Sequence, residues 1–142
     1  SIRRQRQMCI RDRWEALRTA QAGFVEDLDM PIAQGGTNVS GGQRQRLCIA
    51  RMLVARPDVY LFDDSFSALD AVTEAKLQRA MTSYTADATV LVVAQRVASI
   101  SNADQILVME AGELVARGNH DELLRTSSTY REIDASQKAV TA

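Results

Sequence analysis

The sequence is poor in the residues that build cross-linked or metal-stabilised domains. Two cysteines and one histidine occur in 142 residues, and Cys9 and Cys48 share no ligand-like spacing with His120. A disulfide framework or a Cys/His zinc site is therefore not expected. Long hydrophobic runs are also lacking, because no stretch reaches the roughly 18 apolar residues of a transmembrane helix. We expect no part of this chain to cross a bilayer by itself.

An excess of either charge is lacking as well, since 17 Lys and Arg stand against 18 Asp and Glu. Nucleic-acid-binding surfaces usually carry a basic excess, so we expect no nucleic-acid partner. With 46% hydrophobic residues and only 7 Gly and 2 Pro, the composition is typical of an ordinary folded α/β domain.

The first 13 residues differ in charge from the rest. Residues 1–13 carry five arginines and one aspartate, a net charge of +4, which leaves −5 of the total −1 for residues 14–142. They contain neither the apolar core nor the small-residue cleavage site of a secretory signal. A basic arm is one interpretation. The preferred one is a leader foreign to the gene, similar to a translated sequencing adapter, which would make the chain a truncated piece.

Helix-like and strand-like patterns alternate after this leader. Apolar residues recur at helical spacing in segments 14–25, 43–55, 70–84, 97–101, 121–125 and from Ser127 or Ser128 through Gln137. Short apolar runs predict strands at 59–62, 89–94 and 105–109, with a turn at 111–112 into a hairpin strand at 113–116. The first two runs are apolar throughout, so we expect strands buried on both faces of a mostly parallel sheet. The fold class is α/β, with chemistry at the carboxyl ends of the strands.

Smaller expectations concern single side chains. The apolar stripe of the helix at 43–55 lies opposite Arg44, Gln45 and Arg46, and we expect both arginines to face solvent. Cys48 is expected to be a small buried hydrophobic residue. Asn119 is expected to cap a helix at 121–125, and His120 is expected to take part in local capping there.

The strongest chemical signal is a serine and two glycines at the start of a helix. Ser40, Gly41, Gly42 and Gln43 open the segment that follows the turn-rich loop 31–39, and Ser40 offers an N-cap hydroxyl to the helix. A serine hydroxyl, side-chain-free backbone N–H groups and the helix dipole together suit a phosphate. The plain alternative is a glycine-rich turn that leads into a capped helix.

Two adjacent carboxylates end the first predicted strand. Asp63 and Asp64 follow Gln43 by about twenty residues, and one could hold a hydrated Mg²⁺ while the next faces an attacking water. An apolar run that ends in an acid is by itself usually structural. Here a Ser-Ala-Leu-Asp segment at 67–70 follows at once, and the next strand leads into Gln95.

In this order and spacing, the chain resembles the C-terminal half of an ABC-transporter nucleotide-binding domain. VSGGQRQR resembles the signature loop, VYLFDD the Walker B strand, SALD the D-loop and VVAQR the switch-histidine strand. The likeness covers residues from about 14 to 137, and SFSALD and TYREI are most similar to multidrug and lipid exporters. It implies an incomplete P-loop NTPase-like fold with a C-terminal β-hairpin. Residues 14–57 would end the helical subdomain, and residues 58–142 would belong to the ATPase core.

The resemblance implies roles for these motifs. Residues 40–43 would contact the γ-phosphate of an ATP held mainly by a second nucleotide-binding domain, and Asp63 would position Mg²⁺ through water. The D-loop residues Ser67, Ala68, Leu69 and Asp70 would couple the two sites across the interface. Loop 32–38 would lie near the coupling helices of a transmembrane domain. The domain would then work at the cytoplasmic face of the inner membrane.

Three positions depart from the family's pattern. Asp64 replaces the catalytic glutamate and is one methylene shorter, a displacement of about an ångström that can cost ~10²-fold in rate. Gln95 replaces the switch histidine and cannot carry a positive charge, and Gln34 replaces a usual glutamate. The site on this chain's own Walker B is expected to hydrolyse ATP slowly or not at all. This suits the degenerate-site subunit of a heterodimeric exporter, with a tolerant homodimeric exporter as the alternative.

The phosphate loop of such domains does not occur in the sequence. Its glycine-rich motif with a lysine is absent from the 142 residues, and without it most ATP affinity is lost. We expect this chain alone to be no ATPase, and its sheet to expose apolar surface. A non-catalytic module that only donates its signature loop to a partner is the alternative function. A DNA-repair relative is disfavoured because no coiled coil separates the motifs.

Overall fold

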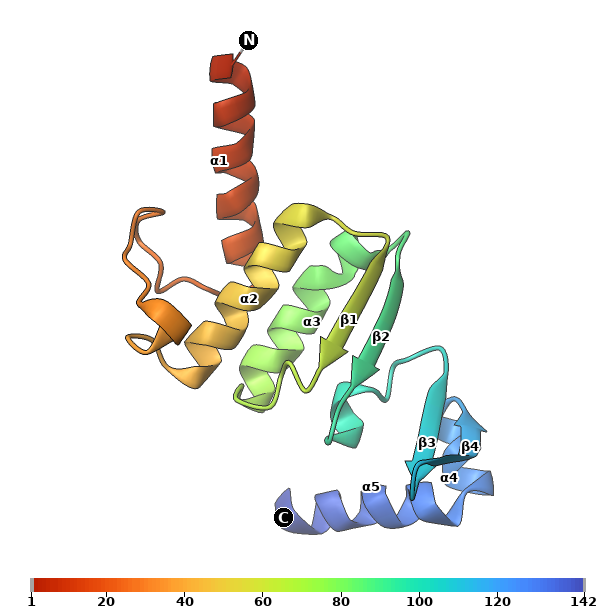
Figure 1. The fold of residues 1–142 in the computed structure, drawn as a ribbon. Helices are drawn as coiled ribbons and strands as arrows, with labels where there is room; N and C mark the ends of the chain where they lie inside the picture. The colour runs from red at the N-terminus through yellow and green to blue at the C-terminus, as the bar shows by residue number, and fades with distance from the viewer. Residues whose placement is uncertain (1, 142) are drawn as a thin grey trace. The chain divides into compact units, whose positions relative to one another are not determined.

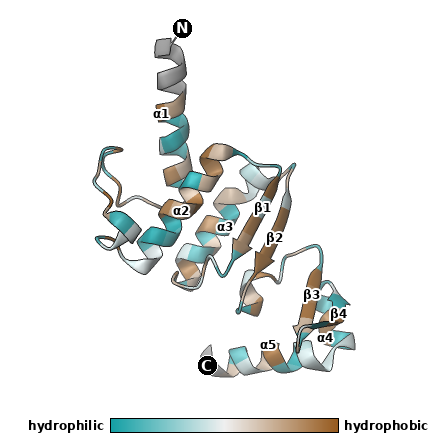
Figure 2. Ribbon diagram, viewed as in Figure 1, coloured by the Kyte–Doolittle hydropathy of each residue, from teal (hydrophilic) through white to brown (hydrophobic). Residues whose placement is uncertain are grey.

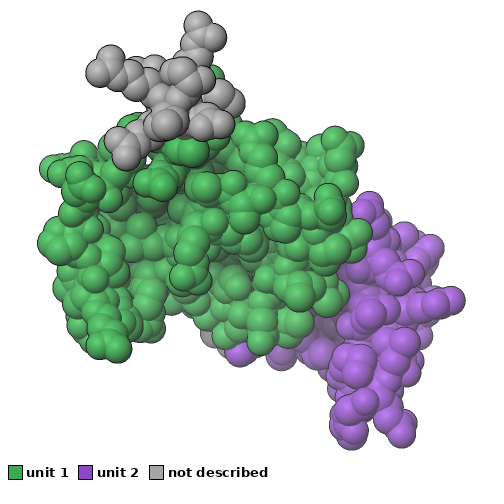
Figure 3. Space-filling view, turned by 45° about the horizontal axis from the view of Figure 1, so that its top comes forward, with its two compact units in different colours: residues 1–93 green, residues 94–142 purple. Residues whose placement is uncertain are grey.

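The computed structural model describes the backbone of residues 2–141 and the side chains of residues 9–139. Contacts divide the chain into two compact units, residues 1–93 and residues 94–142 (Figure 3). The first unit contains α1 (Ile2–Thr19), the 3₁₀ helix η1 (Gln34–Gly36), α2 (Gly41–Ala55), β1 (Val59–Asp63), α3 (Ala71–Thr85) and β2 (Thr89–Val93) (Figure 1). The second contains the 3₁₀ helix η2 (Val97–Ser99), β3 (Ile106–Glu110), β4 (Glu113–Gly118), α4 (His120–Thr126) and α5 (Ser128–Thr141). The predicted α/β alternation is confirmed.

The first helix is displaced from its predicted bounds. Helix α1 also includes residues 2–13, and it ends at Thr19 rather than Val25. It stops because Gln21 takes a left-handed backbone conformation with φ of 58°, which interrupts the helical ladder. The backbone N–H of Ala22 instead donates to the carbonyl oxygen of Leu17 at 2.8 Å.

Strands β1 and β2 form a parallel pair in which Tyr60 lies opposite Val90 and Phe62 opposite Val92. Both α2 and α3 cover the same face of this pair (Figure 1). The core of the first unit lies there and comprises Ala16, Leu17, Ala20, Ala22, Val25, Ile49, Ala50, Leu53, Tyr60, Phe62, Phe66, Leu69, Leu77 and Met81. The rings of Phe62 and Phe66 stack with centroids 5.2 Å apart.

The opposite face of the strand pair is exposed. Side chains alternate along β1, so Tyr60 is 1% exposed while its neighbour Leu61 is 65% exposed. On β2, Leu91 and Val93 are 52% and 56% exposed, and Figure 2 shows both strands hydrophobic along their length. The prediction that both strands are buried on two faces is wrong for this chain, because the two helices pack on one side only. The expectation of exposed apolar sheet surface is confirmed.

Helix α2 begins and ends with specific capping groups. The Ser40 hydroxyl accepts a hydrogen bond from the backbone N–H of Gln43 at 3.2 Å, and the Gln43 side-chain oxygen accepts from the Ser40 N–H at 2.9 Å. This capping box confirms the predicted N-cap. The helix ends at Ala55, and its C-cap Arg56 is left-handed with φ of 45° immediately before Pro57.

The second unit is built around an antiparallel hairpin. Strands β3 and β4 pair from Ile106 opposite Gly118 to Glu110 opposite Glu113, with a register shift near Val108. Ala111 and Gly112 both have positive φ, the conformation of a type I′ turn that suits hairpins. The predicted hairpin is therefore confirmed. Buried Val97, Ile106, Val108, Leu123 and Tyr130 form the core of this unit.

A second capping box begins α4, where Asn119 accepts from the backbone N–H of Glu122. The expected capping role of His120 is wrong, because Asn119 fills it. The His120 Nδ1 atom instead lies 2.8 Å from the hydroxyl of Tyr130, and burial raises the pKa of that phenol. Within residues 2–141, no helix is long and apolar enough to span a bilayer.

Candidate functional site

The N-terminus of α2 presents the predicted phosphate-binding groups. Ser40 and Gly41 are exposed, and the helical hydrogen bonds begin with the Arg44 N–H donating to the Ser40 carbonyl oxygen at 2.8 Å. The N–H groups of the first turn lack acceptors within a helix. Because the capping box uses the Ser40 oxygen as an acceptor, its hydroxyl proton can still be donated to a ligand. This turn therefore has the chemistry of an anion site.

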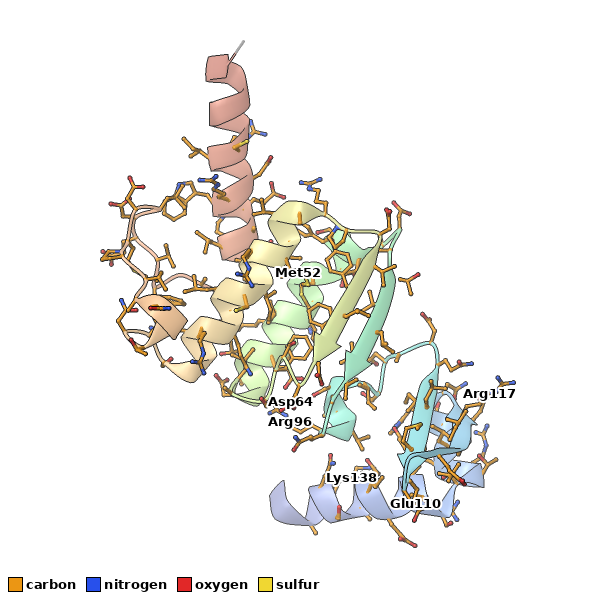
Figure 4. The ribbon with its side chains drawn as sticks, in the orientation of Figure 1. Met52, Asp64, Arg96, Glu110, Arg117 and Lys138 are labelled. Carbon is orange, nitrogen blue, oxygen red and sulfur yellow. The ribbon has the colours of Figure 1, made fainter. Side chains whose placement is uncertain are left out.

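Asp63 and Asp64 end β1 with different environments. Asp63 is exposed and lies on the same strand face as Leu61. Asp64 is half-buried and left-handed, with φ of 49°, and its N–H donates to the carbonyl oxygen of Val93 at 2.9 Å. That bond ends the parallel ladder with β2. The backbone then turns away from the strand, with Asp64 at the start of the loop that leads to α3 (Figure 4).

A pocket of about 370 Å³ opens between α2 and the end of β1. Asp63 and Asp64 line one part of it, and Gln45, Cys48 and Met52 of α2 line another. Cys48 is exposed, so the expectation that it is buried is wrong. Cys48 lies on the side of α2 that lines the pocket. The buried residues of this helix are Ile49, Ala50 and Leu53.

Asp70, in the segment predicted to be a D-loop, caps α3. One carboxylate oxygen accepts from the backbone N–H of Thr73 at 2.9 Å, and the other accepts from the Thr73 hydroxyl at 2.6 Å. The hydrogen bond from the Thr73 hydroxyl has the largest effect in holding the pKa of Asp70 below its ordinary value, and the bond from the Thr73 N–H adds to it. The sequence placed Asp70 at the start of this helix but did not identify it as the cap.

Helix α2 and the loop between β1 and α3 touch through Gly42. A Cβ atom at Gly42 would lie 2.8 Å from the carbonyl oxygen of Ala68 and 3.4 Å from Leu69. At Gly41 the equivalent atom would meet only the Ala68 side chain, at 3.7 Å. Glycine at position 42 is therefore needed for packing, in addition to the exposed N–H groups inferred from the sequence.

Gln45 is a contact residue that the sequence pattern missed. Its side-chain nitrogen donates to the Ser67 hydroxyl at 3.1 Å and, more weakly, to the Asp64 carbonyl oxygen at 3.4 Å. Its side-chain oxygen accepts from the Ala68 N–H at 3.1 Å. The helical spacing of the sequence placed Gln45 on the polar side of α2. Its partners in residues 64–68 are known only from the folded chain, in which this loop packs against α2.

Arg44 and Arg46 of α2 differ in their surroundings. Arg44 is exposed as expected and donates to the carbonyl oxygen of Gly35 at 3.2 Å. Arg46 is half-buried, donates to the Gln21 carbonyl oxygen at 2.7 Å and lies 5.1 Å from the centroid of the Phe24 ring. The expectation that Arg46 faces solvent is therefore wrong, because the chain after α1 folds over it.

The loop before the signature is closed by a side-chain clasp. The Asn38 side chain accepts from the Ala33 N–H at 2.9 Å and donates to the Pro31 carbonyl oxygen at 2.8 Å. Gln34 is exposed in η1 within this loop. The clasp gives loop 32–38 a defined shape immediately before Ser40.

Gln95 belongs to the second unit and is exposed. Its carbonyl oxygen accepts from the Gln137 side chain at 2.6 Å, and the same side chain accepts from the Val97 N–H at 2.8 Å. Helix α5 thus holds the segment at 95–97. Asp64 and Gln95 lie in different units.

The carboxylates fit a hydrated magnesium ion better than a protein-only metal cage. Among the described residues, no group of three or more His, Cys, Asp and Glu side chains could hold a metal ion. Magnesium usually keeps several waters and binds through one or two carboxylates and substrate phosphates. Asp63 has an exposed carboxylate and is therefore suited to be one of these ligands of a hydrated magnesium ion.

Together, the capped glycine-led helix and the parallel strand that ends in two carboxylates define part of an α/β nucleotide-binding domain. Residues 4–67 match the family model described as ABC transporter. This match includes part of the segment interpreted as a foreign leader, and that interpretation stays a prediction.

Similar proteins agree with this class. The chain is 50% identical over 127 residues to an uncharacterized ABC transporter ATP-binding protein of Mycobacterium tuberculosis, covering 87% of this chain and 22% of that protein. It is 43% identical over 118 residues to an ATP-dependent lipid A-core flippase of Haemophilus influenzae. That match covers 80% of this chain and 20% of the flippase. The structure of a bacterial Atm1-family ABC exporter with ATP bound superposes on this chain with a TM-score of 0.81 at 34% sequence identity. The match covers 89% of this chain and 23% of the exporter chain.

The chain belongs to the ABC transporter family and carries part of its ATP-binding domain. It spans about a fifth of the length of the relatives that it matches.

Proposed function

We propose that this chain is part of the motor domain of an ABC exporter and completes an ATP site on a second ATP-binding domain. Its signature loop, residues 40–43, contacts the γ-phosphate of an ATP held mainly by that partner. The observation that carries the proposal is the exposed, capped N-terminus of α2, which presents a hydroxyl and two glycines to a phosphate. The ATP named for the similar Atm1-family structure supports the choice of nucleotide.

The site on this chain's own Walker B strand is proposed to be degenerate. ATP and Mg²⁺ supply the phosphoryl chemistry when bound, with Asp63 holding the ion through water. Asp64 is too short to orient an attacking water as a glutamate would, and Gln95 offers an amide without a positive charge. An intact signature beside an impaired carboxylate supports a heterodimer in which the partner's site hydrolyses ATP. Because no phosphate-loop lysine occurs in the 142 residues, the chain alone is proposed to be inactive.

The proposed partners are a second nucleotide-binding domain and a transmembrane domain. Loop 32–38, shaped by the Asn38 clasp, is the proposed contact with the transmembrane domain. The exporter would hold this domain at the cytoplasmic face of the inner membrane. The flippase and exporter named among the similar proteins support outward transport.

The signature role can be tested with an isosteric pair of variants in the complete exporter. Ser40→Asp and Ser40→Asn both preserve a good N-cap, so α2 should remain stable in each. The aspartate carboxylate would repel the γ-phosphate, whereas the asparagine amide would not. We expect Ser40→Asp to abolish ATP turnover and Ser40→Asn to keep a measurable part of it. Equal turnover in Ser40→Asp and the unmodified protein would refute the proposal.

Degeneracy is tested separately by restoring the family's residues. Asp64→Glu together with Gln95→His should raise ATP turnover, because a longer carboxylate and an imidazole return to the proposed catalytic positions. Single-turnover measurements would assign the gain to this site. An unchanged single-turnover rate would count against degeneracy while leaving the signature role intact.

A further inference from the structure

One glutamine of the signature helix binds the loop that follows the Walker B strand at several points. The Gln45 side chain donates to the Ser67 hydroxyl and the Asp64 carbonyl oxygen, and it accepts from the Ala68 N–H. The amide group therefore acts as donor and acceptor at once, which a carboxylate or a thioether of similar size cannot do. Gln45 is therefore one side chain that joins α2 to residues 64–68.

The same loop is held from within and by close packing. The Ser67 hydroxyl donates to the Asp64 carbonyl oxygen at 2.9 Å. Ala68 lies against Gly42, where a Cβ atom would approach its carbonyl oxygen to 2.8 Å. Gly42 and Gln45 thus contact the loop from successive turns of one helix. The signature N-terminus and the D-loop consequently have one fixed spacing within this chain.

The held backbone has a conformation that needs support. Asp64 has a φ of 49°, which is unfavourable for residues other than glycine, though less so for aspartate. Its carbonyl oxygen, which receives the Gln45 and Ser67 bonds, therefore lies at the bend between the strand and the D-loop. The Ser67 hydroxyl and N–H also donate to this oxygen. Loss of the amide would therefore loosen the bend in part, and it would release the Ala68 N–H from α2.

We propose that Gln45 is a positioning residue that locks the D-loop to the signature helix, so that both reach the partner's ATP with one spacing. This inference rests on the function proposed above. Gln45 itself touches no nucleotide in this scheme. It acts through the backbone of Ala68 and the hydroxyl of Ser67.

The test compares three substitutions at this position in the complete exporter. Gln45→Ala removes the amide and its volume, Gln45→Met restores the volume without hydrogen bonds, and Gln45→Glu keeps only the acceptor for the Ala68 N–H. We expect kcat for ATP hydrolysis to fall about tenfold in Gln45→Ala and Gln45→Met, because a misplacement of about 1 Å can cost about 10²-fold and we expect a smaller shift here. Gln45→Glu should fall less. KM for ATP should stay within about twofold, because the partner supplies most of the ATP affinity.

Two further measurements separate positioning from general stability. Hydrogen exchange of the Ala68 amide should accelerate in Gln45→Ala and Gln45→Met, because its acceptor is gone. Gln78→Ala, which removes an amide bonded to Glu74 on α3, is the matched control and should change neither kcat nor this exchange rate.

Each outcome has a defined meaning. Recovery of kcat in Gln45→Met would show that Gln45 only fills space, and the inference would be overturned. Unchanged Ala68 exchange in Gln45→Ala would overturn it as well. If Ser40→Asp stops turnover while all three Gln45 variants hydrolyse ATP normally, this inference fails and the proposed function stands. If Ser40→Asp is itself fully active, the proposed function fails.

Discussion

The contact between Gly42 and Ala68 gives a sharp test of how the signature helix packs. Replacing Gly42 by alanine would place a methyl carbon 2.8 Å from a backbone carbonyl oxygen, a separation that real contacts do not allow. Replacing the adjacent Gly41 by alanine creates only an ordinary contact of 3.7 Å. The two variants change the same residue type, by the same methyl group, in the same helical turn.

The magnitude follows from two opposing effects. Alanine is favoured over glycine in helices by up to about 1 kcal/mol, and both variants should gain some of this. Overpacking of a close contact typically costs about 1–3 kcal/mol, and only Gly42→Ala should incur it, because the obstructing atom belongs to the backbone. We therefore expect Gly42→Ala to be less stable than Gly41→Ala by about 2 kcal/mol.

Urea denaturation of the 142-residue chain can measure this difference. The single tryptophan, Trp14, packs against the core of the first unit and reports its unfolding by fluorescence. The difference should appear in the transition midpoint with little change in the slope. Equal midpoints for Gly41→Ala and Gly42→Ala would refute the close approach of Ala68 and with it the packing reason for Gly42.

Three further outcomes are expected. Thr73→Val should raise the pKa of Asp70 in an NMR titration, because the hydroxyl that stabilises the carboxylate is lost. The stabilisation that Asp70 gives to the folded chain is fully present above about pH 4. It is lost as the pH falls through the depressed pKa of Asp70 in the folded state. In urea denaturation of the chain, Phe62→Ala should cost about 3–5 kcal/mol and Leu61→Ser less than about 0.5 kcal/mol, because the first side chain is buried and its neighbour is exposed; similar losses would contradict the one-sided core. Asn119→Ala should destabilise α4 by about 1 kcal/mol through loss of its cap, and unchanged thermal unfolding of the second unit would argue against the capping box.

Local features of the fold were predicted from the sequence because they depend on neighbours along the chain. Ser40 before two glycines, with Gln43 at the third helical position, contains all the atoms of a capping box. Residues Ala111 and Gly112 between two apolar runs likewise determine a hairpin turn. The order of motifs from residue 40 to Gln95 was sufficient to identify the family, because each motif is short and contiguous.

Burial was predicted less well, because it depends on what packs on each side of an element. The apolar runs of β1 and β2 indicated strands covered on both faces, but α2 and α3 pack on the same face, which leaves Leu61 and Leu91 exposed. Cys48 resembled a buried residue by type alone. Its exposure was decided by the angular position of the side chain on α2, at the pocket beside β1.

The sequence by itself determined the family, the order of helices and strands, the caps of α2 and α4, and which residues are candidates for the carboxylate and switch roles. Only the tertiary structure decided which of these residues meet. Gln45 and Ser67 are 22 positions apart, as are Phe24 and Arg46, and no periodic pattern relates them. Their contacts exist because loops fold back onto α2. The Gln45 amide also bonds to backbone atoms of residues 64 and 68, which every sequence carries alike. For that reason the hydrogen bonds of Gln45 to residues 64–68 could be found only in the folded chain.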